Sequence, residues 1–489
     1  MSKINAPLYE RLVAHHEQSQ AAFHIPGHKG GRSFNSLGAK FYKELLKLDL
    51  TELLGLDDLH QPTAVIGEAE QLAAELFHAE RTFFLVNGTT AGNLAMVLAA
   101  CNAGEKLIVE RNVHKSVVNG LLLARAKPVF VASEIDEELG VAAGISLTAL
   151  SDALDSHPDA KGVLITNPNY YGMTRNINEI SCLVHQYGMP LLVDEAHGAH
   201  FGFHPDFPQS AMQQGADVVV QSTHKMLSAM GMGSMLHLRG KLVDPERVRF
   251  FLAMVLTTSP SYPIMASLDL TRAWIAKEGS GLWRDVLRNL VVFYERMEGR
   301  LQQIELVGGV CGGKSDPLKL TIHIKSGTTY EDSTTLFTGG ELNQMLQARQ
   351  IYTELADLRN VLCVFSAGTT AVELDLLAMA LLEIDGKLVS GRNERLQLPT
   401  FVSGFEEIDL TTNLAGKHEI VPLEDAANRV AAAMIIPYPP GVPVIQLGER
   451  ISSEMIEYLE QLLRAGISIH GVNQVAQGEQ LRPHVTVLG

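Results

Sequence analysis

Two stretches of sequence decide the fold: residues 191–200, which read LLVDEAHGAH, and residues 218–225, which read VVVQSTHK. Each begins with three aliphatic residues, as a short buried strand does. Each then changes abruptly to polar side chains, with Asp194 directly after the first apolar run and Lys225 five residues after the second. An apolar run followed by reactive side chains is typical of a strand that ends at the ligand-binding edge of a sheet.

The same pattern recurs across residues 64–239. Further apolar runs occupy residues 83–86, 107–109 and 162–165, and helix-like segments such as residues 91–100 lie between the runs. This alternation predicts a three-layer α/β domain with a buried, mostly parallel sheet. Polar residues follow all five runs. Because parallel strands end at one edge of a sheet, the five ends predict a single shared site.

The pattern changes beyond residue 239. Residues 318–324 alternate as a strand with one face in water would, and residues 361–365 predict another strand. We therefore expect smaller α+β domains after the large one. The predicted organisation is an N-terminal arm (1–40), a large domain (41–290), a small α+β domain (291–385) and a C-terminal domain (386–489).

The composition is that of an ordinary globular protein, with 489 residues, 46% hydrophobic and 19% charged. The net charge of −16 and the lack of a basic block argue against nucleic-acid binding. The start of the chain has no signal-peptide pattern, and no apolar run is long enough to cross a membrane. Four widely spaced cysteines without a CxxC pair indicate reduced thiols, so a cytoplasmic location is expected.

Lys225 and Asp194 suggest one particular chemistry. A lysine can form a Schiff base with an aldehyde, and a carboxylate can keep a pyridine nitrogen protonated, which are the two groups that pyridoxal 5′-phosphate (PLP) needs most. Lys225 lies between a buried strand and a small apolar segment, where desolvation would lower its pKa and make it nucleophilic. Taken singly, Lys225 could be a surface lysine and Asp194 a turn cap.

Other polar residues at the strand ends fit the same cofactor. Thr89 and Thr90 precede a helix, where hydroxyls and free N–H groups can hold a phosphate, although an ordinary helix cap is the alternative. Ser222 could add a phosphate contact. His114 could stack on a cofactor ring or simply pack, and His224 could contact phosphate or move protons.

A metal site is the alternative interpretation of residues 194–200. Asp194, Glu195, His197 and His200 include a His-x-x-His pair beside carboxylates, which can bind zinc. The segment runs from a strand into a loop, however, so the two histidines need not share a face. We therefore predict no metal.

The chain resembles a known family at several motifs: residues 23–31 (FHIPGHKGG), 56–60 (LDDLH), 113–116 (VHKS), 193–198 (VDEAHG) and 222–225 (STHK). Residues 258–262 (TSPSY) and 438–441 (YPPG) fit the same pattern. These motifs resemble the bacterial ornithine/lysine/arginine decarboxylases, and the resemblance runs nearly end to end. It implies a fold-type-I, PLP-dependent transferase-like fold for the large domain.

The resemblance also implies a role for each matching residue. Lys225 would carry the cofactor, Asp194 would pair with its ring nitrogen, and His114 would stack on the ring. His197 would lie near the cofactor's phenolic oxygen or the substrate carboxylate. Glu449 would bind the substrate's distal cation, with a solvated helix-start glutamate as the alternative. Phosphate contacts would come from Thr89, Thr90, Ser222 and His224, and across a dimer interface from Thr258 or Ser259.

Two departures from the family pattern bear on assembly and on phosphate binding. Long members have an N-terminal wing before the first motif, which here begins within the first thirty residues. Ring assemblies built on that wing are not expected, and we predict a homodimer or tetramer with the active site at the dimer interface. The first phosphate loop also reads Gly-Thr-Thr in place of Gly-Thr-Ser, which keeps both hydroxyls.

The predicted reaction is decarboxylation of arginine, lysine or ornithine to a polyamine-pathway amine. The short architecture favours a biosynthetic enzyme that makes agmatine or cadaverine, with arginine slightly preferred. One alternative is an aminotransferase, in which Arg450 or Arg482 would grip the substrate carboxylate, although neither lies in a recognisable motif. Another is a non-catalytic regulator, which would have no need for both Lys225 and Asp194.

Overall fold

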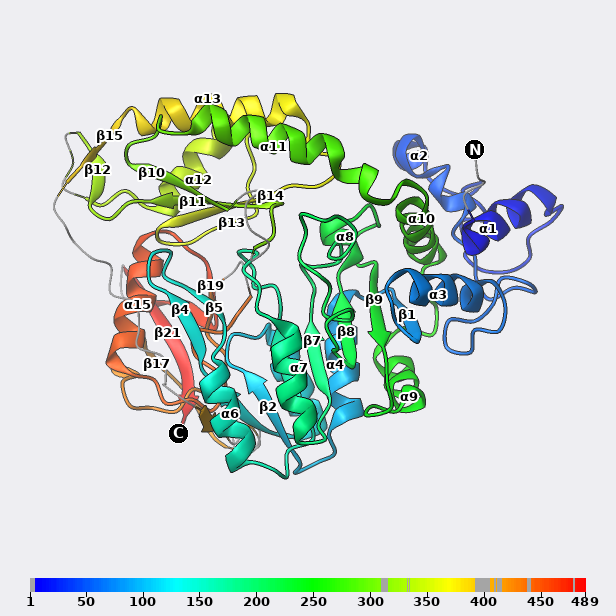
Figure 1. Cartoon of the computed structure of the whole chain (residues 1–489), viewed down its shortest axis with the longest axis horizontal. Helices are drawn as coiled ribbons and strands as arrows, with labels where there is room; N and C mark the ends of the chain where they lie inside the picture. The colour runs from blue at the N-terminus through cyan, green and yellow to red at the C-terminus, as the bar shows by residue number, and fades with distance from the viewer. Residues whose placement is uncertain are drawn as a thin grey trace.

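The computed structural model describes residues 5–308, 315–331, 333, 335–391, 405–408, 410, 416–437, 441–477 and 480–489 (Figure 1). Cys311 and residues 438–440 of the YPPG motif lie outside this part of the chain. Within the described residues, no helix is both long and apolar enough to cross a membrane.

The large unit is built on an eight-stranded sheet. Six strands run in one direction, while β9 and β16 are antiparallel to their neighbours, which confirms the mostly parallel sheet. The five expected apolar runs correspond to β1, β2, β6, β7 and β8. In spatial order the strands are β1 (Arg81–Leu85), β9 (Ser234–Leu238), β8 (Val218–Gln221), β7 (Leu191–Asp194), β6 (Val163–Thr166), β2 (Lys106–Glu110), β3 (Lys127–Val131) and β16 (Phe405–Glu407).

Helices cover both faces of this sheet, so its strands are buried on both sides. Leu107 and Val109 of β2 point into one hydrophobic core, whereas Ile108 between them points into the other. Continuous apolar runs are the sequence signature of such double burial. The first face carries α3 (Val65–Leu76), α4 (Gly88–Ala100), α5 (Lys115–Ala124), α9 (Pro245–Val255) and α10 (Tyr262–Glu278), and the second carries α6 (Leu147–Ser156) and α7 (Ile177–Gln186).

Helix α4 begins at Gly88, three residues before the expected start at residue 91. Gly88 has a φ of +73°, a conformation that glycine adopts without strain. One turn later, Gly92 lets the helix approach the sheet, because a Cβ at this position would lie 2.3 Å from Cγ2 of Val220 in β8. The first turn of α4 is thereby held beside the end of β8.

The N-terminal segment lies against the large unit at the side of α3 and α10 (Figure 1). Leu8 and Leu12 are buried there, and the backbone N–H groups of Leu8 and Tyr9 donate to the Asp269 carboxylate of α10. The segment contains α1 (Pro7–Gln18), α2 (Ser36–Tyr42) and the short 3₁₀ helix η1 (Leu45–Lys47).

The next unit packs a small antiparallel sheet under two long helices, α11 and α13 (Figure 1). The elements are η2 (Gly279–Trp283), α11 (Arg284–Met297), β10 (Ile304–Gly308), β11 (Lys319–Ile324), β12 (Thr328–Tyr330), α12 (Gly339–Gln347), β13 (Leu355–Ala356), β14 (Asn360–Val364), α13 (Ala371–Asp385) and β15 (Leu388–Ser390). The expectation that residues 318–324 have one face in water is wrong, because every residue of β11 is buried.

The polar face of β11 is covered by the large unit. Lys319 contacts His197, and His323 bonds Asn360, which donates in turn to the carbonyl of Leu139. Leu139 lies in the turn between β4 (Ser133–Asp136) and β5 (Val141–Ile145). The alternating pattern therefore predicted the strand correctly, but its polar side chains contact other protein groups and not solvent.

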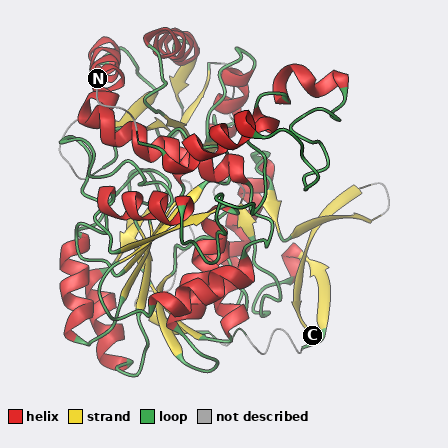
Figure 2. Cartoon of the chain, turned by 90° about the vertical axis from the view of Figure 1, so that its right-hand side faces the viewer, coloured by secondary structure: helices red, strands yellow, loops and turns green. Residues whose placement is uncertain are grey.

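The C-terminal unit has its own hydrophobic core between a helix and a three-stranded sheet. Figure 2 shows strands near the C-terminus extending from the body of the molecule. The elements are β17 (His418–Pro422), η3 (Leu423–Asp425), β18 (Ile436–Pro437), α15 (Ser453–Arg464), β19 (Ile469–His470), β20 (Val472–Gln477) and β21 (Gln480–Leu488). The exact domain boundaries stay a prediction.

Candidate active site

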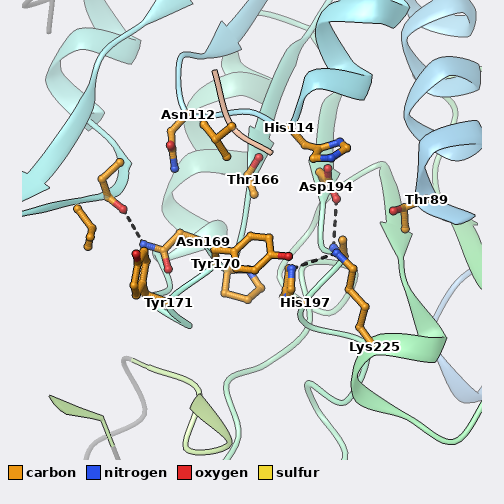
Figure 3. A pocket seen from close by; sticks show the side chains of 15 residues that line it. Thr89, Asn112, His114, Thr166, Asn169, Tyr170, Tyr171, Asp194, His197 and Lys225 are labelled. Carbon is orange, nitrogen blue, oxygen red and sulfur yellow. Dashed lines mark hydrogen bonds between the residues drawn. The ribbon is translucent and has the colours of Figure 1, made fainter. Parts of the chain in front are cut away.

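A pocket with about 680 Å³ of empty space, its open mouth included, lies at the carboxyl ends of the central strands (Figure 3). Side chains that follow β2, β6 and β7 meet there with Lys225 of α8 (Thr223–Met226) and Thr89 of α4. Val442 of the C-terminal unit closes one side. The lining residues are Thr89, Asn112, His114, Val141, Ala142, Thr166, Pro168, Asn169, Tyr170, Tyr171, Asp194, Ala196, His197, Lys225 and Val442.

Lys225 projects into this pocket from the single turn of α8. Its side chain keeps solvent-accessible surface because it faces the open cavity, and its Nζ lies 3.1 Å from Nε2 of His197. The surrounding protein nevertheless desolvates the amine and lowers the pKa of Lys225, an effect that Asp194 and Glu354 partly oppose. A lysine with a lowered pKa has a larger neutral fraction, and the neutral amine is the nucleophile.

Asp194 lies at the end of β7 and is held by two hydrogen bonds. Its Oδ2 accepts from Nδ2 of Asn93 at 2.8 Å, and its Oδ1 accepts from the backbone N–H of Ala196 at 3.1 Å. The side chain is buried yet reaches the pocket wall. A carboxylate fixed in this way can pair with a cationic nitrogen without reorganising.

His114 belongs to the same hydrogen-bond network. Its Nδ1 accepts from the Ser116 hydroxyl at 2.7 Å, and that hydroxyl accepts from the Asn93 amide, which also donates to Asp194. Burial, the largest influence, lowers the pKa of His114 even though Asp194 opposes the shift. The structure thus presents a neutral, oriented imidazole beside Asp194.

His197 lies between two lysines. Its Nε2 contacts Nζ of Lys225, and its Nδ1 lies 3.0 Å from Nζ of Lys319. The imidazole ring also packs against the ring of Tyr170, with the two ring centroids 4.2 Å apart. Burial, assisted by Lys319 and Lys225, lowers the pKa of His197 well below its ordinary value. The ring is therefore neutral at physiological pH.

The start of α4 offers a site for an anion. The Asn87 side chain does not cap this helix, so the first-turn N–H groups have no side-chain partner, and the Thr89 hydroxyl lies 3.0 Å from that of Ser222. Uncapped helix starts attract phosphate groups. Deeper in the pocket, the buried Thr166 hydroxyl has no protein partner. Both features fit a phosphorylated polar ligand.

The structure does not bring every predicted residue to the pocket wall. Thr90 is exposed next to Thr89, and His224 uses Nδ1 to donate to the carbonyl of Gly233 at 3.0 Å. Thr258 and Ser259 are also exposed and do not line the pocket of their own chain. The phosphate roles predicted for these residues stay predictions.

Glu449 is buried but already paired. Nη2 of Arg111 lies 2.8 Å and 2.6 Å from its two carboxylate oxygens, and the backbone N–H of Gln446 donates to it at 2.7 Å. It is therefore not the solvated glutamate that we considered as an alternative. Glu449 does not line the pocket, so a substrate cation would have to compete with Arg111. Its substrate-binding role stays a prediction.

The residues of the metal alternative point in different directions. His197 faces the pocket, but His200 is fully buried with its Nε2 2.9 Å from Oδ1 of Asp316. Glu195 accepts from the Ala211 N–H and the Gln221 amide, away from the pocket. Over the described residues, no three His, Cys, Asp or Glu side chains gather as a metal site would require.

Sequence reasoning missed three residues of this site. Tyr170 and Tyr171 follow the Thr166–Asn167 strand end, and their hydroxyls donate to Glu354 at 3.1 Å and Asp357 at 2.5 Å. The strand end was recognised, and reading four residues further would have included both tyrosines. Lys319 was assigned to a solvent-facing strand surface, and no local signal separates a covered polar face from a wet one.

Comparison with known proteins identifies the family. The model for the "Orn/Lys/Arg decarboxylase, major domain" matches residues 6–311, and that for the C-terminal domain of the same family matches residues 409–486. The chain belongs to the Orn/Lys/Arg decarboxylase family. This confirms the resemblance seen in the sequence motifs and the prediction of an enzyme that decarboxylates a basic amino acid.

Individual relatives cover nearly the whole chain. An uncharacterized protein of Bacillus subtilis, YaaO, is 39% identical over 98% of both chains, and an arginine decarboxylase of the same organism is 38% identical over 96% of both. The constitutive lysine decarboxylase of Escherichia coli has a similar solved structure, with a TM-score of 0.81 and 24% identity over 99% of this chain and 82% of that one. The structural likeness confirms the fold class.

Proposed function

We propose that this protein is a PLP-dependent arginine decarboxylase. The observation that carries the proposal is the meeting of Lys225 and Asp194 in one pocket, at the carboxyl ends of strands β8 and β7 of a decarboxylase-family chain. These are the two protein groups that PLP chemistry most requires.

The pocket residues fit PLP one group at a time. Lys225 would hold the aldehyde carbon, the fixed Asp194 carboxylate would face the ring nitrogen, and the neutral His114 ring would stack on the cofactor. Thr89, Ser222 and the uncapped start of α4 would receive the phosphate. When bound, PLP supplies an electron sink for the pair that the substrate α-carbon keeps after its carboxylate leaves.

The chain's own residues would orient the substrate and handle its proton. His197 is neutral and lies within hydrogen-bond distance of Lys225, so it can exchange a proton with a group held beside Nζ. Tyr170 forms the adjoining wall of the pocket and packs against the His197 ring. A wall of this kind strengthens the interactions of every charge inside the pocket.

Arginine is favoured over lysine as the substrate. Relatives named arginine decarboxylase are 35–38% identical to this chain, whereas those named lysine decarboxylase are 25–26% identical. Besides the predicted Glu449, Glu354 and Asp357 lie behind the pocket tyrosines and could attract a distal cation. A guanidinium has a planar fork of N–H donors that can bond two neighbouring oxygens at once, whereas a lysine ammonium acts as a point charge.

The test is release of carbon dioxide by the full-length protein, supplied with PLP and with arginine, lysine or ornithine in turn. We expect the highest kcat/KM for arginine and stoichiometric agmatine. Preference for lysine or ornithine would correct the substrate alone. If no substrate releases carbon dioxide but a 2-oxo acid acceptor becomes aminated, the protein is an aminotransferase instead. A polyamine-forming role and a cytoplasmic location stay predictions.

We also propose a homodimer whose active sites lie at the subunit interface. Two observations support this proposal. Thr258 and Ser259 are exposed in their own chain, and the N-terminal part of the chain has large apolar side chains that are exposed. Phe23, Leu37 and Leu54 are more than nine-tenths exposed, with relative accessibilities of 97%, 93% and 98%. Exposed apolar side chains of this size commonly mark a protein–protein interface.

Subunit mixing tests this arrangement. The Lys225→Ala variant and a Thr258→Ala/Ser259→Ala variant are each expected to be weakly active or inactive. After mixing and subunit exchange, each heterodimer would contain one complete site, so about a quarter of wild-type activity should return if dimers form at random. Unmixed variants incubated alone are the control. Exchange without any gain in activity would contradict a shared site.

A further inference from the structure

Lys319 is a second lysine at the active site, and it comes from a different part of the chain. It lies at the start of β11 in the small unit, only 1% exposed, and reaches across to the large unit. Its Nζ is 3.0 Å from Nδ1 of His197, while Nζ of Lys225 is 3.1 Å from Nε2 of the same ring. One imidazole therefore joins the two amines. Figure 3 shows the His197–Lys225 half of this arrangement.

The surroundings of Lys319 are shaped to accommodate it. Gly172 leaves room for its stem, because a Cβ there would lie 2.6 Å from Cγ of Lys319. The backbone of Asp316 donates to Gly172 at 2.8 Å, and the N–H of Lys319 donates to Asp316 at 3.1 Å. No ion pair links Lys319 to a carboxylate in the described part of the chain. A buried amine without such a partner is costly, which makes a purely structural role a poor explanation.

The contacts of Lys319 determine which nitrogen of His197 carries the proton. At neutral pH Lys319 is largely an ammonium, which has no lone pair and can only donate, so it donates to Nδ1 and leaves the ring proton on Nε2. The amine of Lys225, in its neutral form, can accept that proton's hydrogen bond. That proton then points towards Nζ of Lys225. In the opposite tautomer, the Nδ1–H group would face the Lys319 amine, and the hydrogen bond from Lys319 to Nδ1 would be lost.

We propose that Lys319 is a positioning residue that holds His197 as the Nε2–H tautomer and supplies, through His197, the proton that decarboxylation consumes. This inference rests on the proposed function. When the bond between the α-carbon and the carboxylate breaks, carbon dioxide leaves and the α-carbon keeps the electron pair. A C–H bond then forms with the proton from Nε2, while Nδ1 takes a proton from the Lys319 ammonium. Solvent then protonates Nε2 while Nδ1 returns its proton to Lys319, which restores both groups with the net uptake of one proton per turnover.

The charges around Lys319 suit a donor of this kind. Burial is the largest influence and lowers the pKa of Lys319 to about 8. Asp316 and Glu354 oppose the shift, and Lys225 adds to it. His197, the group in direct contact, is neutral. Lys319 is thus largely protonated at neutral pH yet gives up its proton more readily than an exposed lysine does.

The tautomer can be measured directly in the full-length protein. Solid-state NMR of a sample with ¹⁵N-labelled histidine, assigned by difference from His197→Gln, is expected to show Nε2 protonated and Nδ1 unprotonated. In Lys319→Met the Nδ1–H form should become populated. In Lys319→Arg, which keeps a donor, the wild-type tautomer should persist. A tautomer that is the same in all three proteins, or an Nδ1–H form in the wild type, would overturn the proposal.

Kinetics separates proton supply from tautomer control. Lys319→Met should lower kcat by about 10²-fold with little change in KM, the usual size of a lost proton-transfer contribution. Lys319→Arg should also have low kcat, because a guanidinium does not release its proton. The fall of wild-type kcat as pH rises above about 8 should be absent from both variants. Lys325→Met, an exposed lysine directly after the same strand, is the control and should match the wild type.

Two outcomes would contradict this role. A raised KM with unchanged kcat would make Lys319 an anchor for the substrate carboxylate, and full activity of Lys319→Met would remove it from the reaction. Failure of the proposed function itself is distinguishable, because a wild-type protein that decarboxylates no basic amino acid still yields the NMR comparison.

Discussion

Replacement of Lys225 by alanine is expected to abolish decarboxylation, with a fall in kcat of more than about 10⁴-fold, as for the loss of other covalent catalytic groups. The reason is the position of its amine on the pocket floor, next to His197 and near Asp194. The wild-type protein should be yellow when loaded with PLP, and borohydride should bleach it and modify Lys225. Absorbance spectra, peptide mass and carbon dioxide release measure the three effects.

Lys225→Arg is the matched control for this experiment. It keeps a cation beside His197 and Asp194 but cannot form a covalent bond to an aldehyde. If Lys225 served only to balance charge, the arginine variant would regain activity. We expect it to remain as inactive as Lys225→Ala while unfolding at a similar urea concentration to the wild type. A yellow, borohydride-sensitive Lys225→Ala protein would contradict covalent attachment at this residue.

Much of the pocket could be predicted from sequence because its residues follow apolar strands directly. Asp194 is the last residue of β7, and Lys225 follows β8 by a single helical turn, so the chain position of each residue gives its place in space. The parallel sheet then brings these strand ends to one edge. His114 and Thr89 were located by the same rule, and the family resemblance then supported the stacking and phosphate roles that their positions had already suggested.

The remaining parts of the site depend on packing between distant segments. Lys319 reaches His197, about 120 residues away in sequence, because β11 packs its polar face on the large unit. Periodicity gives the two faces of a strand, but what covers each face is decided by the tertiary structure. Glu449 is a second example. Its partner Arg111 lies 338 residues away in sequence, and no local sequence pattern predicts that ion pair.

The second large effect is expected for Asp194→Asn, which should lower kcat by on the order of 10²–10³-fold, the usual cost of removing one preorganised electrostatic contact. Asparagine keeps the shape of the side chain and an oxygen for the Ala196 N–H, but its amide nitrogen replaces the oxygen that accepts from Asn93, so it removes the charge and that one hydrogen bond. Without that charge, a ring nitrogen in the pocket would lose its proton and with it the electron-withdrawing power of the ring. Lys225 would also lose a group that favours its protonated form, which lowers its pKa further.

Glu195→Gln is the matched control, because it alters the adjacent buried carboxyl without touching the pocket. Burial raises the pKa of Glu195 to about 8, so this residue is mostly uncharged at neutral pH already, and its replacement should leave kcat unchanged. The two substituted residues are neighbours in the sequence. Cofactor affinity, absorbance spectra and kcat should nevertheless change in Asp194→Asn and stay at the wild-type values in Glu195→Gln. Equal losses in both would mean that the segment as a whole is sensitive to substitution. A selective loss in Asp194→Asn would assign the effect to the Asp194 carboxylate, which faces the pocket and accepts from the Asn93 amide, because the hydrogen bonds of Glu195 go to Ala211 and Gln221 instead.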